Sequence, residues 1–273
     1  MPELPEVETV RKTLVQLVQD RQIVDSEVSW PRMIKKPDDV EAFRFLLAGQ
    51  TIRNISRKGK FLIFNLDDYA LVSHLRMEGK YSIGGGEADK HTHVRFFLDD
   101  HRELHYRDVR KFGTMHLFPA GTEYDVAPLA KLGPEPMEGS FTPEYLQRIF
   151  AKTTRNVKAV LLDQAAVAGL GNIYVDEALF RAGIFPGIAA ASLDRRAVAR
   201  VHRETIETLG AAIEAGGTSI RSYLNGNGEM GYFQQQLYVY GSKGHPCKRC
   251  GSEIERAVVA GRGTHYCPSC QCS

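Results

Sequence analysis

The first eight residues, Met1 to Glu8, hold the clearest candidate for covalent chemistry. A small second residue allows Met1 to be removed, and Pro2 is then left as a free secondary amine. Because an α-amino group titrates near pH ~8, part of it is neutral and nucleophilic at about pH 7. Such an amine can attack an electrophilic sugar or carbonyl carbon to form an iminium, and Glu3 can move the protons that this needs. The alternative is structural, because Pro5 followed by acidic residues is also an ordinary helix start.

The C-terminus carries the strongest single motif, two Cys-x2-Cys pairs that are separated by sixteen residues: Cys247, Cys250, Cys267 and Cys270. Four thiolates in two tight turns suit one tetrahedral zinc ion, and a closed site of this kind is structural. Disulfides are the weaker interpretation, and Cys272 is left over. Within this zinc ribbon, residues 258–264 are expected to form a hairpin whose turn presents Arg262 between two glycines, either to a ligand or to solvent.

A glycine-rich segment, Gly169-Leu170-Gly171-Asn172, precedes a predicted helix. Backbone amides at a helix N-terminus bind phosphate well, and Lys158 lies close enough in sequence to suit such a site. A tight turn between two helices explains the glycines equally well, so both interpretations stay open.

Three more polar segments adjoin predicted strands: Arg57-Lys58-Gly59-Lys60, His74-Leu75-Arg76-Met77-Glu78-Gly79 and Asp108-Val109-Arg110-Lys111-Phe112-Gly113. Arg110 and Phe112 at a loop tip suit insertion into a base stack, although Met77 and Phe112 taken singly are more typical of a core. His91 and His93 can be read as metal ligands or, more simply, as a surface or hydrogen-bonding pair.

Two kinds of structure must position these residues. Apolar residues at helical spacing predict an opening helix over 4–19, with Pro2 and Glu3 fixed at its start. Short β-rich runs separated by turns then favour an antiparallel sandwich or barrel. These runs cover residues 23–30, 51–56, 61–66, 70–75, 94–98, 103–106 and 114–118. Helical periodicity follows over 145–151, 157–162, 173–182 and 194–215.

The 273 residues, 43% of them hydrophobic, are enough for about two domains with real cores. We predict a first domain over 1–130, a helical domain over 131–236 with a loop at about 217–236, and the ribbon over 237–273. No apolar run approaches the ~20 residues of a membrane span, and the acidic N-terminus does not fit a signal peptide, so we expect a cytoplasmic protein. The formal net charge of +2 says little about nucleic acid, although basic residues cluster at 53–60 and in the tail.

Taken in order, segments 1–8, 57–60, 74–79, 108–113 and 169–174 and the ribbon resemble the bacterial formamidopyrimidine-DNA glycosylase family, base-excision enzymes for 8-oxoguanine. The resemblance runs essentially end to end, with no departure at a matching functional position. It implies an α+β fold: an N-terminal helix plus an antiparallel β-sandwich, then a helical domain with a helix–two-turns–helix motif and a C-terminal four-cysteine zinc ribbon. It also implies one structural Zn²⁺ per chain and, as partner, double-stranded DNA with 8-oxoguanine opposite cytosine, bound between the two domains. The protein would be a monomer associated with the bacterial nucleoid.

The resemblance further implies a role for each matching residue. Pro2 would attack the anomeric carbon, expel the base and leave a Schiff base, with Glu3 as proton donor and acceptor. Lys60 would act in the β- and δ-elimination steps, and Arg262 would grip phosphates beside the lesion. The implied DNA contacts, among them the residues that fill the gap left by the extruded base, are His74, Met77, His91, Arg110, Phe112, Lys158 and Asn172. The implied lesion-recognition residues, most of them in a loop that caps the base, are Glu78, Thr218, Ser219, Ile220, Arg221, Ser222 and Tyr223.

Three alternatives are weighed against this interpretation. A sister enzyme of the endonuclease VIII type has the same fold and mechanism but acts on oxidised pyrimidines, and the Arg110/Phe112 pair argues against it. A non-catalytic zinc-ribbon DNA-binding protein would use Pro2 only to start a helix and would never form a covalent adduct. A small-molecule enzyme with an N-terminal proline base, as in tautomerases, leaves the ribbon without a role.

Overall fold

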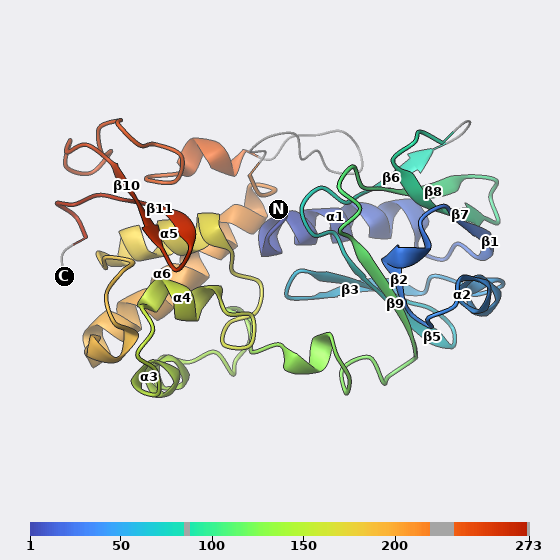
Figure 1. Cartoon of the computed structure of the whole chain (residues 1–273), viewed down its shortest axis with the longest axis horizontal. Coiled ribbons are helices and arrows are strands. Elements are labelled where there is room, and N and C mark those ends of the chain that lie inside the picture. The colour runs from blue at the N-terminus through green and yellow to red at the C-terminus, as the bar shows by residue number, and fades with distance from the viewer. Residues whose placement is uncertain (85–87, 219–231, 272–273) are drawn as a thin grey trace. The chain divides into compact units, whose positions relative to one another are not determined.

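The computed structural model describes residues 1–84, 88–218 and 232–271, and these form two compact units (Figure 1). The first unit contains Met1–Ala130 and Thr218, and the second contains Lys131–Gly217 and the described residues from Tyr232 onward. The division into three domains that the sequence suggests stays a prediction.

The first unit begins with helix α1 (Leu4–Val18), drawn in blue in Figure 1. Proline in its first turn and the Glu3/Glu6 capping box define its start. Val7, Val10 and Leu14 are spaced so that they share one face of the helix, and all are buried in the core of the unit. The predicted opening helix is therefore present, one residue shorter at its end.

Two sheets share this core with α1. The larger sheet has the order β2-β9-β5-β4-β3 and consists of β2 (Ile34–Lys36), β3 (Asn54–Lys58), β4 (Phe61–Asn65), β5 (Tyr69–His74) and β9 (Thr114–Pro119). The smaller has the order β1-β7-β8-β6 and consists of β1 (Ile23–Val28), β6 (Lys80–Gly84), β7 (Thr92–Leu98) and β8 (Glu103–Arg107). Neighbouring strands are antiparallel, except that β2 runs parallel to β9. The predicted antiparallel sandwich is confirmed with this one parallel pair.

Loops 75–79 and 108–113, here called the crossing loops, both pass between the two sheets. Loop 75–79 leaves β5 of the larger sheet and enters β6 of the smaller, and loop 108–113 leaves β8 and enters β9. His74 pairs with Thr114 at the β5–β9 end, and Lys80 pairs with Arg107 at the β6–β8 end. Because both flanks are paired, the crossing loops run alongside each other.

In the described part of the first unit, one α-helix and two strands have no counterpart in the sequence prediction: α2 (Val40–Leu47), β2 and β6. Asp39 caps α2 by accepting a 2.8 Å hydrogen bond from the Ala42 N–H. β6 is an edge strand that ends in glycine, so its sequence lacks the β-branched pattern that marks the central strands. The run predicted at 51–56 is a strand at Asn54–Lys58.

The second unit is built from α3 (Pro143–Ala151), α4 (Val157–Leu162), α5 (Asn172–Ala182) and α6 (Arg195–Glu214) around one apolar cluster. Side chains of Thr142, Asn156 and Asp194 cap α3, α4 and α6. The hairpin of β10 (Glu255–Val259) and β11 (Arg262–Tyr266) completes the ribbon. Short 3-10 turns lie at Ala190–Ser192 and Phe233–Gln236 in this unit, at Pro31–Met33 in the first unit, and at Leu129–Lys131 where the two units join in sequence. The α+β fold class is thus confirmed.

A buried carboxylate joins α5 to the chain that leads into the ribbon. Glu177 accepts hydrogen bonds of 2.8–2.9 Å from the N–H groups of Tyr238, Val239 and Tyr240. Burial raises the pKa of Glu177, while the three backbone donors oppose that rise.

Across residues 1–84, 88–218 and 232–271, none of the helices combines the length and the apolar character of a membrane-spanning segment.

Candidate active site and nucleic-acid interface

The start of α1 holds the two candidate catalytic residues in a buried position. Pro2 is buried behind an exposed Met1, and Glu3 has only 3% of its surface exposed. Glu3 is the N-cap of α1, and its backbone N–H donates to Glu6 Oε2 at 2.8 Å. The helix start therefore fixes the backbone next to Pro2 and leaves the Glu3 carboxyl in a dry environment.

Glu6 also reaches a residue far away in the sequence. Its Oε1 accepts a 2.7 Å hydrogen bond from the Thr218 N–H and a 3.0 Å hydrogen bond from the Thr218 hydroxyl. Thr218, the first of the predicted capping-loop residues, is thereby tied to the first turn of α1, within the first unit. The other predicted residues of that loop lie outside the described residues, namely Ser219, Ile220, Arg221, Ser222 and Tyr223.

Lys60 lies in the tight turn between β3 and β4 and is 5% exposed. A chain of contacts connects this turn to α1. Arg57 Nε donates to Glu8 Oε2 at 3.1 Å, and Arg57 Nη1 donates to the Gly59 carbonyl at 3.0 Å. Burial raises the pKa of Glu8, but the side chains of Arg11 and then Arg57 together hold it below its ordinary value. The turn that carries Lys60 is thus braced against the helix that carries Glu3.

His74, at the end of β5, is buried and electrically neutral. Burial first, and then the charges of Arg76 and Lys60, lower its pKa to about 3. Its Nδ1 accepts a 2.8 Å hydrogen bond from the Arg76 N–H, so the single proton of the neutral ring sits on Nε2. The ring also meets Phe61 edge-on, with centroids 4.5 Å apart. His74 can therefore donate a hydrogen bond through Nε2 without carrying charge.

The crossing loops expose the residues that the sequence predicts to enter the base stack. Met77 is 38% exposed and Phe112 is 52% exposed. Glu78 and Arg110 are exposed as well, and the Arg110 guanidinium lies 4.8 Å from the centre of the Phe112 ring. These side chains are exposed and are not part of the core.

A buried aspartate shapes loop 108–113 from inside. Asp108 is fully buried; its Oδ1 accepts from the Arg110 N–H at 3.0 Å and its Oδ2 from the Gly113 N–H at 2.8 Å. The Asp108 carbonyl lies 2.8 Å from His93 Nε2, and its N–H donates to the His91 carbonyl at 2.9 Å. His91 is thereby placed beside the loop, and His93 serves structure, as the simpler interpretation of this pair predicts.

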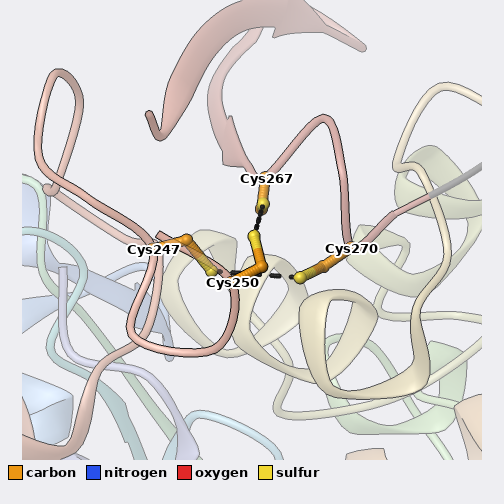
Figure 2. Close-up of side chains that lie close together, drawn as sticks. All are labelled: Cys247, Cys250, Cys267 and Cys270. Atoms are coloured by element: carbon orange, nitrogen blue, oxygen red, sulfur yellow. Dashed lines mark hydrogen bonds between the residues drawn. The ribbon is translucent and has the colours of Figure 1, made fainter. Parts of the chain in front are cut away.

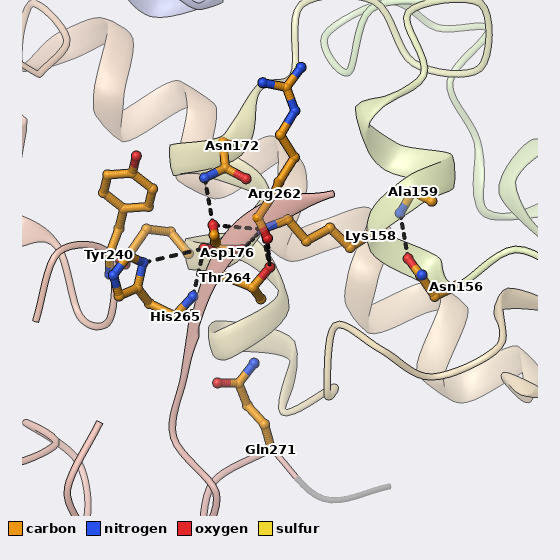
Figure 3. Close-up of polar contacts among 12 residues, drawn as sticks. Asn156, Lys158, Ala159, Asn172, Asp176, Tyr240, Arg262, Thr264, His265 and Gln271 are labelled. Carbon is orange, nitrogen blue, oxygen red and sulfur yellow. Dashed lines mark hydrogen bonds and ion pairs between the residues drawn. The ribbon is translucent and has the colours of Figure 1, made fainter. Parts of the chain in front are cut away.

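In the second unit, the predicted residues Lys158 and Asn172 contact the β10–β11 hairpin, which carries the third, Arg262 (Figure 3). Lys158 Nζ lies 2.6 Å from Asp176 Oδ1 and donates to Thr264 Oγ1 at 2.7 Å. Asn172 Nδ2 donates to the Gly263 carbonyl at 2.9 Å. The Lys158 side chain has no exposed surface, so it braces α4 and α5 against the hairpin; a direct DNA contact by this residue stays a prediction.

Arg262 is the first residue of β11 and is exposed. The two-residue turn before it is formed by Ala260 (φ 52°) and Gly261 (φ 69°), both left-handed, as tight hairpins require. Arg262 thus follows the turn, whereas the sequence suggested that it forms it. Figure 3 shows its guanidinium directed away from Lys158 and Asp176, while Thr264, two residues on, accepts a hydrogen bond from Lys158.

The four predicted ribbon cysteines converge on one point (Figure 2). Their four Sγ atoms lie within 4.8 Å of one another, with 3.5 Å between Cys250 and Cys267 and 3.9 Å between Cys247 and Cys270. A tetrahedron with Zn–S bonds of ~2.3 Å has S–S edges of ~3.8 Å, whereas a disulfide needs ~2.05 Å. The cluster therefore fits one structural zinc ion, as predicted. Cys272 lies outside the described residues.

Three buried acidic residues that hold the site in place were not predicted from the sequence. Glu6 looks like an ordinary first-turn acid, Asp108 like a loop residue, and Asp176 like a helix-surface charge. Each turns out to be buried with its carboxylate directed at backbone N–H groups or at a lysine. For Asp176 a signal exists in hindsight, because it lies four residues after Asn172 and therefore on the same helix face.

The chain combines a sandwich unit that carries a buried N-terminal Pro-Glu pair with a helical unit and a zinc ribbon. This combination is that of the helix–two-turns–helix DNA glycosylases. Three family descriptions match the chain in this order: Formamidopyrimidine-DNA glycosylase N-terminal domain over residues 1–115, its H2TH domain over 132–223, and the zinc finger found in FPG and IleRS over 244–271. The chain belongs to the formamidopyrimidine-DNA glycosylase family.

Relatives of the same family match the chain over its whole length. The chain is 61% identical to a formamidopyrimidine-DNA glycosylase of Shouchella clausii (strain KSM-K16), over 99% of both proteins, and 55% identical to one of Geobacillus kaustophilus (strain HTA426), over 99% of the chain and 100% of the relative. It is also similar to a Lactococcus lactis FPG mutant solved with Fapy-dG-containing DNA, with a TM-score of 0.93, 43% identity and full coverage of both chains.

This family consists of DNA glycosylases with AP lyase activity, and the chain is such an enzyme of base-excision repair. The binding-only and tautomerase-like alternatives do not agree with this membership, whereas the endonuclease VIII type differs in its substrate.

Proposed function

We propose that this glycosylase removes 8-oxoguanine opposite cytosine, together with formamidopyrimidines, from duplex DNA through a Schiff base on Pro2. Support comes from the similar Lactococcus lactis proteins, which were solved with Fapy-dG-containing DNA and with abasic-site DNA. Fapy-dG is a substrate of such a reaction, and an abasic site is what remains in the DNA once the base has been released. We further propose that the enzyme acts as a monomer on nucleoid DNA.

In the proposed reaction, the Pro2 nitrogen attacks C1′ of the damaged nucleotide once Met1 has been removed. The N-glycosidic electron pair leaves with the base, which takes up a proton, and opening of the sugar gives the iminium. The iminium makes the C2′ proton acidic. Loss of that proton expels the 3′ phosphate, and a second elimination expels the 5′ phosphate. Glu3 is the group that exchanges protons with the sugar.

The observation that carries this proposal is the buried Pro2-Glu3 pair at a fixed helix start. A secondary amine is a useful nucleophile when it is neutral, and proton transfer is effective when the carboxyl is held beside the reacting atoms. The Glu3 N–H is held by Glu6, and Glu6 also holds Thr218 at the start of the capping loop. Thr218 is thereby linked to the helix that carries the nucleophile.

The remaining assignments concern DNA binding. Lys60, braced through Arg57 against α1, is proposed to contact phosphate and to assist elimination. His74 is proposed to donate to a phosphate oxygen through its neutral ring, and His91 to contact the backbone next to it. Such contacts fix the register of a protein on DNA without reading sequence.

The gap left by the extruded base is proposed to be filled from the crossing loops. Met77 and Phe112 are exposed apolar side chains, and apolar wedges unstack base steps in other DNA-bending proteins. Arg110 stacks against Phe112 and has donors that suit the acceptor atoms of the opposite cytosine. Glu78 is proposed to face the lesion beside Met77.

In the second unit, Arg262 is proposed to grip phosphates beside the lesion, together with Asn172 at the N-terminus of α5. Backbone N–H groups at that terminus add to this site. Lys158 is proposed to belong to the same interface, and its contacts with Asp176 and Thr264 support at least an indirect contribution through the hairpin.

The substrate proposal is tested by single-turnover excision on four matched duplexes. These carry 8-oxoguanine opposite cytosine, a formamidopyrimidine opposite cytosine, an oxidised pyrimidine opposite its normal partner, and no lesion. We expect rapid release of both oxidised purines and much slower release of the pyrimidine. Faster excision of the pyrimidine would contradict the proposed substrate class and would favour an activity of the endonuclease VIII type.

A further inference from the structure

Each crossing loop ends in a glycine whose missing side chain has a specific reason. Gly79 closes loop 75–79 and Gly113 closes loop 108–113. Neither has a positive φ, so neither needs to be glycine for its backbone conformation. A methyl group on either residue would instead overlap the hydroxyl of one and the same side chain, Tyr106. The two loops therefore share a single buried contact point.

Tyr106 is a firm anchor for that contact. It is fully buried on β8, and its ring meets the Tyr81 ring in a T-shaped contact with centroids 5.0 Å apart. The Tyr81 hydroxyl in turn donates to Ser73 Oγ at 2.8 Å. Because Ser73 belongs to β5 and Tyr81 to β6, this hydrogen bond ties the ring against which Tyr106 packs to the larger sheet. A side chain held in this way cannot shift without disturbing the core.

The loops themselves are stiff. In loop 108–113 the Asp108 carboxylate accepts from two backbone N–H groups, those of Arg110 and Gly113. In loop 75–79 the Gly79 N–H donates to the Leu75 carbonyl at 2.9 Å. Each loop thus keeps its own shape, and the contact of both glycines with one hydroxyl sets their position relative to each other.

We propose that Tyr106 is a positioning residue for duplex opening: its hydroxyl, seated between Gly79 and Gly113, keeps Met77 in register with the Arg110–Phe112 pair. The inference rests on the proposed function, in which those three side chains fill the gap left by the extruded base. Insertion succeeds only when the wedge residues enter one base step together. A misplacement of ~1 Å at such a site can lower a rate by up to ~100-fold.

The matched set of variants is Tyr106→Phe, Gly113→Ala, the double variant of these two, and Gly79→Ala with and without Tyr106→Phe. At Gly113 a methyl group would meet only Tyr106 among its nearest neighbours, so shortening Tyr106 relieves part of the overlap. At Gly79 the methyl group would also approach the backbone carbonyl of Leu75 at 2.6 Å. Tyr106→Phe, which itself lacks the positioning hydroxyl, should therefore restore part of the Gly113→Ala loss, at most to its own level, and leave the Gly79→Ala defect largely unchanged.

The readout is single-turnover base release from two duplexes, one with 8-oxoguanine opposite cytosine and one with the same lesion opposite an abasic analogue. The second duplex has no opposite base to hold in place, so accurate wedge insertion matters less. We expect Gly113→Ala to lower release from the paired duplex by ~10- to ~100-fold, with a much smaller loss on the second. Both duplexes are assayed with the same preparation, so a fraction of unfolded protein lowers both rates equally.

An equal loss on both duplexes would overturn the inference, because it would mean general destabilisation. A double variant no faster than Gly113→Ala would overturn it as well, because Tyr106 would then not be what the methyl group disturbs. The proposed function fails in a different way: wild-type protein would release no 8-oxoguanine from either duplex.

Discussion

The Nζ atom of Lys158 lies 2.6 Å from Oδ1 of Asp176, and neither side chain has any exposed surface. The remaining oxygen of Asp176 accepts from the His265 N–H at 2.9 Å, and Lys158 also donates to the Thr264 hydroxyl. One buried ion pair thus joins two helices to the zinc-ribbon hairpin, two residues away from Arg262. The position of Arg262, a proposed phosphate contact, is thus set by the buried charges of Lys158 and Asp176.

Breaking this pair from one side should destabilise the second unit. Lys158→Met leaves the Asp176 charge buried without its partner, and a loss of ~3–5 kcal/mol in the free energy of unfolding is expected. The double variant Lys158→Met/Asp176→Leu should recover most of that loss, because a buried ion pair can be replaced by apolar side chains. Urea unfolding monitored by circular dichroism measures both. Arg203→Met, on the exposed face of α6, is the control and should unfold like the wild type. Wild-type stability of Lys158→Met would contradict the importance of the ion pair.

Removing the zinc ion should unfold the ribbon and weaken DNA binding. The Cys267→Ser variant loses one of four thiolates and is expected to contain less than one zinc ion per chain, with the β10–β11 hairpin no longer held near α5. Elemental analysis gives the zinc content, and binding to a duplex with an uncleavable abasic analogue gives the affinity. Cys272→Ser removes the fifth cysteine and should keep a full zinc ion. Wild-type zinc content in Cys267→Ser would contradict the four-thiolate site.

His74 should make the protein less stable in acid. Folding lowers its pKa from 6.5 to about 3, so between these values the unfolded chain binds more protons than the folded chain. Its contribution is complete above pH ~6.5 and falls as the pH is lowered, by up to ~1.4 kcal/mol per pH unit. His74→Gln removes this dependence, so wild type and variant should differ in the slope of unfolding free energy against pH. Parallel slopes between about pH 5 and about pH 7 would rule out a buried neutral His74.

Glu3→Gln should abolish base release while keeping lesion binding. The amide has nearly the shape of the carboxyl but cannot exchange protons, and general acid–base catalysis contributes ~10²- to ~10⁴-fold. Single-turnover release of 8-oxoguanine measures the first property, and affinity for the same duplex measures the second. Lys12→Gln, at an exposed position of the same helix, is the control and should release the base like the wild type. Equal base release by Glu3→Gln and wild type would refute the role given to Glu3.

The elements that the sequence predicts well are those whose signal is local. The helix at Leu4–Val18 follows from an apolar stripe with proline in its first turn, and the zinc site follows from the spacing of four cysteines. The contact between Glu6 and Thr218 could not be predicted in this way, because it joins residues 212 positions apart. The burial of Lys158 was missed for the same reason: a basic residue near a glycine-rich turn suggests phosphate, and only tertiary packing brings Asp176 to it.

The crossing loops show the same limit. From the sequence, Met77 and Phe112 taken singly are more typical of a core, and only the Arg110/Phe112 pair at a loop tip suggests an exposed wedge; in the structure both apolar side chains are exposed. Their final glycines look like ordinary turn residues, and Tyr106 looks like a core aromatic of a strand. That these three positions meet follows only from the pairing of β6 with β8 and of β5 with β9.

The central claim, covalent catalysis by Pro2, is tested most directly by borohydride trapping. Zinc-loaded protein from which Met1 has been removed is mixed with a duplex carrying 8-oxoguanine opposite cytosine, and with an undamaged duplex as control. Reduction should give a covalent protein–DNA band with the damaged duplex alone, and peptide mapping should locate the attachment at Pro2. Pro2→Gly should give a weaker band. The absence of any band from wild-type protein, or its attachment at another residue such as Lys60, would contradict the proposed nucleophile.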